Sequence, residues 1–303
     1  MSTQIECPDR IAPLPHLSSA SEGASAPPPV TFIRPARAWQ LINLRELWHY
    51  RELILILAWR DVKVRYKQTL LGAAWAVLQP ALMMVVFTIF FGRLAHVASG
   101  GVDYSVFVYA GLLPWTFFAT AITNAGNSVV GSERLITKVY FPRLAVPLAS
   151  VGAALVDSLI ACGLLLVLML YNGITPSISL LLAPLFMAAI LLAAVGVGTL
   201  MAALNVAYRD FRYVIPFLTQ FWMFATPTVY MQPDKNASGT LQFFLALNPM
   251  TSLVAAFRGA VLGEAVEPIV WGQVALAVVL SVALFLAGCL YFRRVEDSFA
   301  DVI

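Results

Sequence analysis

The side chains of this 303-residue chain that could carry chemistry do not form a catalytic pattern. The three histidines, His16, His49 and His96, lie in three different regions, and no nucleophile has a plausible base beside it. No phosphate-binding loop of the form GxxxxGKS or GxxxxGKT is present, and no His, Cys or carboxylate cluster has metal-ligand spacing. By itself the chain is therefore not expected to be an enzyme, to bind a nucleotide or to hold a metal.

Fixed charge gathers just ahead of the first long apolar run, at Arg60, Asp61, Lys63, Arg65 and Lys67. These residues belong to a helical pattern over residues 39–68, with most apolar side chains on one face and most charges on the other. The apolar face includes Leu55, Trp59 and Val62, whereas Leu57 falls outside it. Such a helix suits the membrane surface. It either only anchors the chain or also docks a cytoplasmic partner, and periodicity supports both interpretations equally.

One acidic side chain, Asp157, lies deep inside a later apolar run. An unpaired charge at that depth costs about 3 kcal/mol, so we expect Asp157 to be neutral, paired or facing a wet cavity. It is the only support for a proton relay, and a lone carboxylate without an intramembrane His, Lys or Glu is a poor relay.

The elements that position these residues follow from composition. The chain is 60% hydrophobic and 12% charged, against about 25% charged in a typical soluble domain, which indicates an integral membrane protein. After the charged helix come six apolar runs, each near the ~20 residues that cross a bilayer. They cover residues 72–95, 105–129, 144–171, 178–204, 213–231 and 269–292. We therefore expect an all-α integral membrane protein with six transmembrane helices.

Three regions result from this division. Residues 1–38 are rich in Pro, Ser and Ala and lack the apolar core of a signal peptide, which predicts a disordered cytoplasmic tail. Residues 39–69 form the amphipathic interface helix, and residues 70–303 form the six-span transmembrane domain.

The distribution of Lys and Arg predicts the orientation. With the amino terminus in the cytoplasm, the cytoplasmic segments carry thirteen of the basic residues from Arg45 onward. The opposite side carries three, namely Arg93, Lys235 and Arg258. This asymmetry places both termini in the cytoplasm.

The longest external connection, residues 232–268, contains two short apolar pieces at 241–247 and 250–262, separated by Asn248-Pro249. Pieces of this length cannot span and are typical of interfacial or re-entrant segments. They predict a re-entrant external helical hairpin between spans five and six, with Arg258 near water or paired with Glu264.

Aromatic residues make up 12% of the chain and concentrate in the first, second and fifth spans. An interfacial belt would place them at the ends of all spans alike. The uneven distribution indicates a surface shared by three spans, where aromatic rings could stack on sugars or pack around lipid chains. For any individual residue, ordinary helix packing is an equally good explanation.

Seven motifs occur in order along the chain from Leu44 to Ile303. They are YRELILILAWRDVKVRYKQTLLGAAWAVLQP, AGLLPWTFF, ERLITKVYFPR, ALNVAYRDFRYVIP, TPTVY, NPMTSLVAAFR and FRRVEDSFADVI. Together they resemble the transmembrane permeases of type-2 ABC exporters for polysaccharides. One such motif alone is a weak signal, whereas seven collinear motifs on a topology already indicated by charge are specific.

The resemblance implies a half-transporter, in which two copies of this chain work with two copies of a separate ATPase that binds ATP and Mg. It implies ATPase contacts in two segments. The first comprises Arg60, Asp61, Lys63 and Arg65, and the second comprises Glu133, Arg134, Lys138, Tyr140 and Arg143.

The resemblance also implies an aromatic-lined channel and an external gate. Carried over, the channel is lined by Trp75, Phe87, Phe91, Trp115, Phe118, Phe217, Phe221, Trp222 and Tyr230. The gate contains Asn248, Pro249 and Arg258. The implied cargo is a polyprenyl-pyrophosphate-linked glycan such as O-antigen, crossing a Gram-negative inner membrane, although capsule and teichoic-acid exporters share these motifs.

Two alternatives stay open at this point. An ABC exporter of small drugs or lipids shares the six-span plan, and a lateral apolar cleft would favour it over an aromatic tube. A proton-coupled secondary carrier is a different class, and the absence of an internal repeat argues against it.

Overall fold

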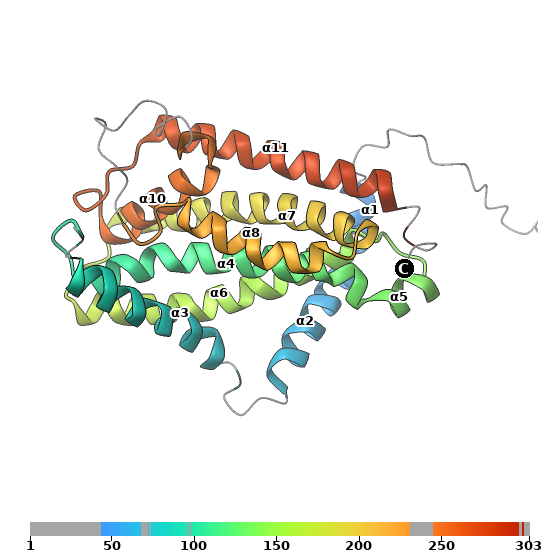
Figure 1. Ribbon diagram of the computed structural model, residues 1–303, viewed down its shortest axis with the longest axis horizontal. Coiled ribbons are helices and arrows are strands. Elements are labelled where there is room, and N and C mark those ends of the chain that lie inside the picture. Colours follow the sequence, from blue (N-terminus) through green and yellow to red (C-terminus); the bar gives the residue numbers. More distant parts are fainter. Residues whose placement is uncertain are drawn as a thin grey trace, which may run out of the picture. The chain divides into compact units, whose positions relative to one another are not determined.

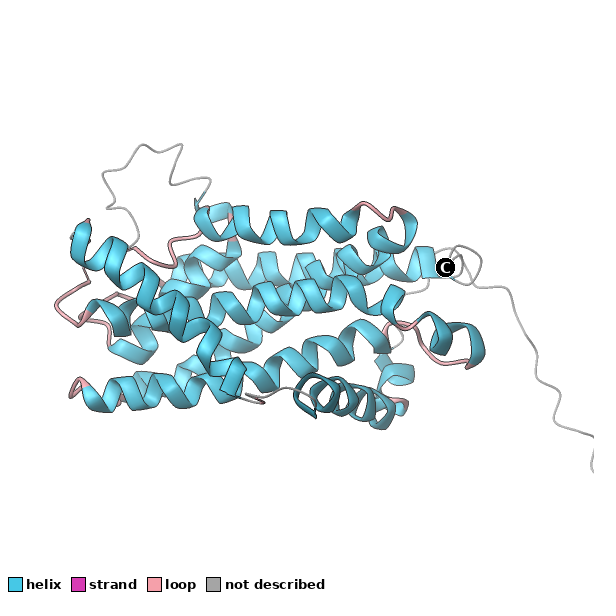
Figure 2. Cartoon of the chain, turned by 60° about the horizontal axis from the view of Figure 1, so that its bottom comes forward, coloured by secondary structure: helices cyan, strands magenta, loops and turns pink. Residues whose placement is uncertain are grey.

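The computed structural model describes residues 44–67, 72, 74–95, 97, 99–230, 245–296 and 299 (Figure 1). They belong to the folding unit Ala38–Ile303. The predicted tail, residues 1–38, lies outside the described residues. Every regular element in the described ranges is helical, as Figure 2 shows in a second view, so the all-α expectation is confirmed there.

The helices follow one another along the chain in a fixed order. They are α1 (Leu44–His49), α2 (Arg51–Lys67), α3 (Ala74–Phe87) with its π-helical continuation η1 (Thr88–Leu94), α4 (Tyr104–Gly131), α5 (Glu133–Lys138), α6 (Ala145–Tyr171), the 3₁₀ turn η2 (Ile178–Leu182), α7 (Ala183–Ala207), α8 (Phe211–Phe224), α10 (Pro249–Leu262) and α11 (Trp271–Val295).

Five helical segments in the described ranges are long and apolar enough to cross a membrane: Ala74–Leu94, Tyr104–Gly131, Ala145–Tyr171, Ile178–Ala207 and Trp271–Val295. They match the first four predicted spans and the sixth.

The predicted fifth span corresponds to α8, which has only 14 residues. At 1.5 Å per residue it is about 21 Å long, short of the ~30 Å hydrocarbon core. The chain continues from Ala225 to Tyr230 as turns and bends. Pro227 explains the early end, because a proline cannot continue the helical hydrogen bonding and disfavours helix in the residue before it. The six-span count therefore stays a prediction.

Helix α4 lies in the middle of the bundle and supplies more buried residues than any other described helix (Figure 1). It packs against α6, α7, α8 and α10. Where α7 crosses α11, the backbones touch, because a Cβ built on Gly288 would lie 1.9 Å from the carbonyl oxygen of Gly196. Small residues allow such close approach between membrane helices, where van der Waals packing drives association.

Helix α10 is enclosed by α4, α7 and α11, and all of its residues are buried. Asn248 caps it by accepting a hydrogen bond from the Met250 N–H at 3.1 Å, and Pro249 occupies the first turn. Part of the other piece of the predicted hairpin, residues 241–244, lies outside the described residues. The hairpin as a whole stays a prediction.

The interface helix α2 lies on α6. Leu57 and Val62 of α2 are buried, whereas Leu55 and Trp59 are 66% and 57% exposed. The expectation for Leu57 was wrong. Helix α2 has a buried apolar face and a second apolar face that is exposed. The helical periodicity of the apolar residues does not tell which of the two faces is buried.

Candidate functional site

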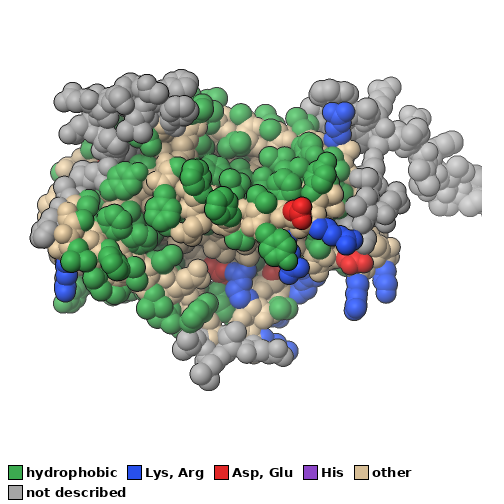
Figure 3. Space-filling model, viewed as in Figure 1, with side chains coloured by type: hydrophobic (Ala, Val, Ile, Leu, Met, Phe, Trp, Pro, Cys, Tyr) green, Lys and Arg blue, Asp and Glu red, His purple; other side chains and the backbone are tan. Residues whose placement is uncertain are grey.

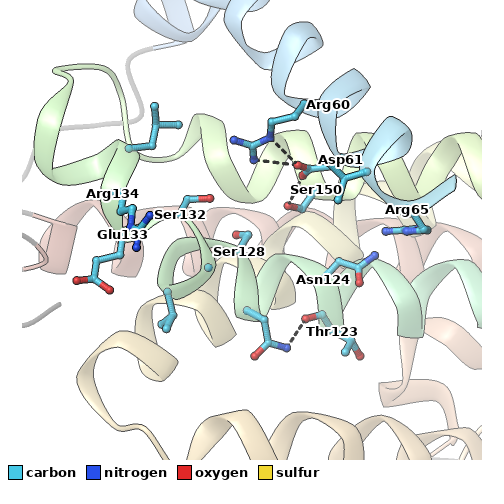
Figure 4. Close-up of a pocket in the computed structure, with 15 residues that line it drawn as sticks. Arg60, Asp61, Arg65, Thr123, Asn124, Ser128, Ser132, Glu133, Arg134 and Ser150 are labelled. Carbon is cyan, nitrogen blue, oxygen red and sulfur yellow. Dashed lines mark hydrogen bonds and ion pairs between the residues drawn. The ribbon is translucent and has the colours of Figure 1, made fainter. Parts of the chain in front are cut away.

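A polar cleft of about 830 Å³ opens between α2, the carboxyl-terminal end of α4, and α5 (Figure 4). Helix α2 contributes Arg60, Asp61, Val64 and Arg65, and the start of α5 with the residue before it contributes Ser132, Glu133, Arg134 and Leu135. The cleft therefore joins the two segments that the resemblance marked as ATPase contacts, although they are far apart in the sequence.

The floor of the cleft comes from a polar face of α4 that the sequence reasoning missed. Thr123, Asn124, Asn127 and Ser128 line it. Their spacing of i, i+1, i+4 and i+5 places them on one side of a helix. This spacing within an otherwise apolar span was the signal available in the sequence.

Asp61 ties the rim of the cleft to the bundle. One of its oxygens accepts hydrogen bonds from the Arg60 guanidinium at 2.9 and 3.1 Å, and the other accepts one from the Ser150 hydroxyl of α6 at 3.3 Å. Because Arg60 is exposed, this ion pair contributes little to stability. It leaves the guanidinium at the surface, where a partner can reach it.

The other predicted contact residues lie outside the lining of the cleft. Lys63, Lys138 and Tyr140 are exposed, and Tyr140 is 90% accessible. Arg143 is half-buried at the start of α6. Exposed charged and aromatic side chains on α2 and α5 extend the surface around the cleft.

Arg65 is oriented differently from Arg60. Its Nη1 donates to Oδ2 of Asp157 in α6, and the Tyr66 hydroxyl donates to Oδ1 of the same carboxylate. Of the three states expected for Asp157, the structure shows the paired one. Burial raises the pKa of the Tyr66 hydroxyl above its ordinary value, against the opposing effect of the Arg65 charge. Tyr66 therefore stays a hydrogen-bond donor at neutral pH.

The predicted channel aromatics fall into three groups. Trp75, Phe217 and Phe221 are exposed; Phe91, Trp222 and Tyr230 are half-buried; Phe87, Trp115 and Phe118 are buried in the protomer.

The buried group holds helices together. Phe118 of α4 packs edge-to-face on Trp222 of α8, with ring centroids 5.1 Å apart. The Trp222 Nε1–H donates to Asn248 Oδ1 at 3.0 Å, which links α8 to the cap of α10. Phe87, Trp115 and Phe118 thus contribute to packing, and no channel surface is available to them within one protomer.

The exposed aromatics of α8 form one face. Tyr213, Phe217, Phe221 and Phe224 are 78%, 74%, 65% and 59% exposed, and steps of three and four residues place them on one side of the helix. Hydrophobic side chains cover much of the molecular surface on the side where α3 and α8 lie (Figure 3). We call these four residues the aromatic face.

Among the predicted gate residues, Arg258 is fully buried, and its position corrects the expectation. It was expected near water or with Glu264, but Glu264 is exposed and Arg258 pairs with Glu267. The reason is that α10 is enclosed rather than at the surface, so its arginine needs buried partners. The guanidinium also donates to the carbonyls of Pro227 and Thr228 at 3.1 and 3.3 Å.

Comparison with known proteins identifies the family. The family model described as ABC-2 type transporter matches residues 52–262, from α2 through α10. The chain belongs to the ABC-2 type transporter family. It is thus a multi-pass membrane permease, and membership of this family implies an ATPase partner. The matched region contains the whole cleft, Asp157, the aromatic face and Arg258.

Several similar proteins align with most of this chain. The O-antigen export system permease protein RfbA of Myxococcus xanthus is 32% identical over 260 residues, 86% of this chain and 98% of the relative. The protein of the same name from Klebsiella pneumoniae is 25% identical over 256 residues, 83% of this chain and 95% of the relative. The polysialic acid transport protein KpsM of Escherichia coli is 24% identical over 246 residues, 78% and 91% of the two chains.

Proposed function

We propose that this chain is the permease subunit of an ATP-driven exporter that carries a lipid-linked polysaccharide across the bacterial inner membrane. Two copies of the chain work with two copies of a separate ATPase subunit, which binds ATP and Mg. Both termini and the cleft face the cytoplasm. The O-antigen and polysialic acid names of the relatives support a polysaccharide cargo.

The polar cleft is the observation that carries the proposal. A permease without a nucleotide site must receive force from another protein, and a surface for that contact needs charged, accessible side chains. The cleft presents Arg60, Glu133 and Arg134 from two elements on one surface. Opposite charges across such an interface would orient the ATPase and raise its rate of association.

The aromatic face of α8 supports the cargo class. Its four rings are more exposed than a helix packed on both sides would allow, so a second protomer, the cargo or lipid must cover them. Aromatic rings offer flat surfaces on which sugar rings can stack. In this proposal, Phe217 and Phe221 line the path of the polysaccharide, together with Trp75 of α3.

Deletion of the gene tests the proposal. We expect lipid-linked polymer to accumulate inside the cell and surface polysaccharide to disappear, with recovery on expression of the wild-type chain. Normal surface polysaccharide in the deletion strain would contradict the proposal, and a changed lipid or drug efflux in that strain would favour a different cargo.

A further inference from the structure

The last turn of α2 is joined to α6 by three side chains: Arg65, Tyr66 and Asp157. Both oxygens of the Asp157 carboxylate are used, one by the Arg65 guanidinium and the other by the Tyr66 hydroxyl. Figure 4 shows Arg65 lying apart from Arg60 along α2. The two arginines therefore have separate partners, although both border the cleft.

Asp157 is the only Asp, Glu, Lys, Arg or His of α6. Its side chain is 16% exposed and that of Arg65 is 34% exposed. A carboxylate in an apolar helix is costly unless it is paired, and hydrogen bonds to an ionised group are about twice as strong as neutral ones. Asp157 is thus a costly charge in α6, and both of its described partners, Arg65 and Tyr66, belong to α2.

Two other kinds of contact join α2 to α6. The hydrogen bond from the Ser150 hydroxyl to Asp61 is long, at 3.3 Å, and lies at the rim of the cleft. Leu57 and Val62 of α2 are buried, and a Cβ on Gly152 would lie 3.6 Å from Ala58. Apolar contacts of this kind resist separation but allow helices to slide. The ion pair, by contrast, fixes one point of α2 to one point of α6.

We propose that Arg65, Tyr66 and Asp157 form a charge lock that makes α2 and α6 move together, so that motion of α2 driven by the ATPase reaches the transmembrane bundle. This inference rests on the proposed function, because it takes the cleft as the place where the ATPase acts. Arg65 and Asp157 are positioning residues: they carry the motion, whereas Arg60 and Arg134 contact the partner.

The lock makes a prediction that separates ATPase binding from export. Asp157→Asn leaves every side chain that lines the cleft in place, so the ATPase still binds and hydrolyses ATP at rates close to those of the wild type. Surface polysaccharide falls by about tenfold, because breaking a partly buried ion pair frees α2 from α6. Lys67→Gln is the matched control, because Lys67 is exposed in the same turn of α2 as Arg65 and Tyr66. It leaves ATPase binding, ATP hydrolysis and surface polysaccharide unchanged.

The reversed pair tests the lock directly. Arg65→Asp combined with Asp157→Arg restores opposite charges in the same place, and we expect export to recover most of what either single change loses. A structural loss of either side chain would not be rescued in this way. A proton relay at Asp157 would not be rescued either, because arginine does not release a proton at physiological pH.

A second comparison keeps the test valid if the reversed pair does not fold. Tyr66→Phe removes one hydroxyl with little change in volume. If all three residues act as one lock, Tyr66→Phe added to Asp157→Asn lowers export no further than Asp157→Asn alone, since coupled sites are not additive. The inference is overturned if Tyr66→Phe lowers the export of the Asp157→Asn variant by a further factor. It is also overturned if Arg65→Gln leaves export normal while Asp157→Asn impairs it.

The same measurements separate this inference from the proposed function. If the wild-type chain neither binds an ATPase nor supports surface polysaccharide, the proposed function fails. If the wild type does both and the single changes abolish ATPase binding, Arg65 belongs to the docking surface and the charge lock is overturned.

Discussion

Replacing Arg258 by methionine tests how the discontinuous end of the fifth predicted span is held in place. The segment from Ala225 to Tyr230 is not helical, yet residues 226–229 are buried. Non-helical backbone at membrane depth persists only where the protein satisfies its polar groups. Arg258 does so, because its guanidinium donates to the carbonyls of Pro227 and Thr228.

The expected loss follows from three kinds of contact that one side chain makes: an ion pair, hydrogen bonds to carbonyls and a cation–π contact. Removing one partner of a buried ion pair costs about 3–5 kcal/mol, and here it leaves Glu267, which is 4% exposed, without its guanidinium. Each orphaned carbonyl adds about 1 kcal/mol. The guanidinium carbon also lies 4.0 Å from the Phe107 ring centroid, a contact worth about 2 kcal/mol when desolvated.

These contributions share one side chain and do not simply add, so we expect Arg258→Met to lower the free energy of unfolding by about 4 kcal/mol. Arg93→Met is the matched control. Arg93 is exposed in η1, and its replacement should change stability by less than about 0.5 kcal/mol. Replacing Glu267 by leucine together with Arg258→Met removes the buried carboxylate as well and should recover part of the loss, leaving about 2 kcal/mol for the two carbonyls.

Equilibrium unfolding of the purified permease in mixed detergent micelles measures all four proteins. An Arg258→Met variant within about 1 kcal/mol of the wild type would contradict the stabilising role of these contacts. A double variant less stable than Arg258→Met alone would show that the buried charge of Glu267 is not the main cost.

Three further predictions concern packing, the aromatic face and the cleft. Gly288→Ala should destabilise the protein by about 1–3 kcal/mol in the same unfolding assay, because its Cβ would overlap the α7 backbone, whereas Gly163→Ala, with open space at its Cβ, should not. Phe217→Ala should lower surface polysaccharide without lowering the amount of folded protein, whereas Trp115→Ala should lose about 3–5 kcal/mol of stability because Trp115 is buried. Equal losses of stability in these two variants would contradict the assignment. Arg134→Glu should reduce co-purification of the ATPase at unchanged permease level, and undiminished co-purification would remove Arg134 from the contact.

Much of the fold could be predicted from the sequence because long apolar runs leave few alternatives in a membrane. The first four predicted spans and the sixth follow directly from run length, since only helices satisfy their own backbone in lipid. The fifth predicted span, residues 213–231, stays a prediction, because the helix there, α8, ends at Phe224, ahead of Pro227. Helix periodicity failed at Leu57, since α2 is apolar on two sides.

The site was partly predictable. The resemblance marked two charged segments, and the structure brings Arg60 and Arg134 to one cleft. The partners of charged residues were harder to predict. Glu264 and Glu267 are both near Arg258 in sequence, and only the enclosure of α10 selects Glu267. Likewise, the sequence indicated that Asp157 needed a partner, but pairing across helices depends on how α2 lies on α6.

ATP-dependent transport in inverted inner-membrane vesicles is the decisive test of the claim that this chain exports polysaccharide. The vesicles contain the wild-type chain with its ATPase and are supplied with lipid-linked polysaccharide on their outer face. We expect ATP to make the polysaccharide resistant to an added polysaccharide-degrading enzyme, and vesicles without this chain to give no protection. Polysaccharide that stays fully accessible to the enzyme, in vesicles where the ATPase is bound and hydrolysing ATP, would contradict the claim.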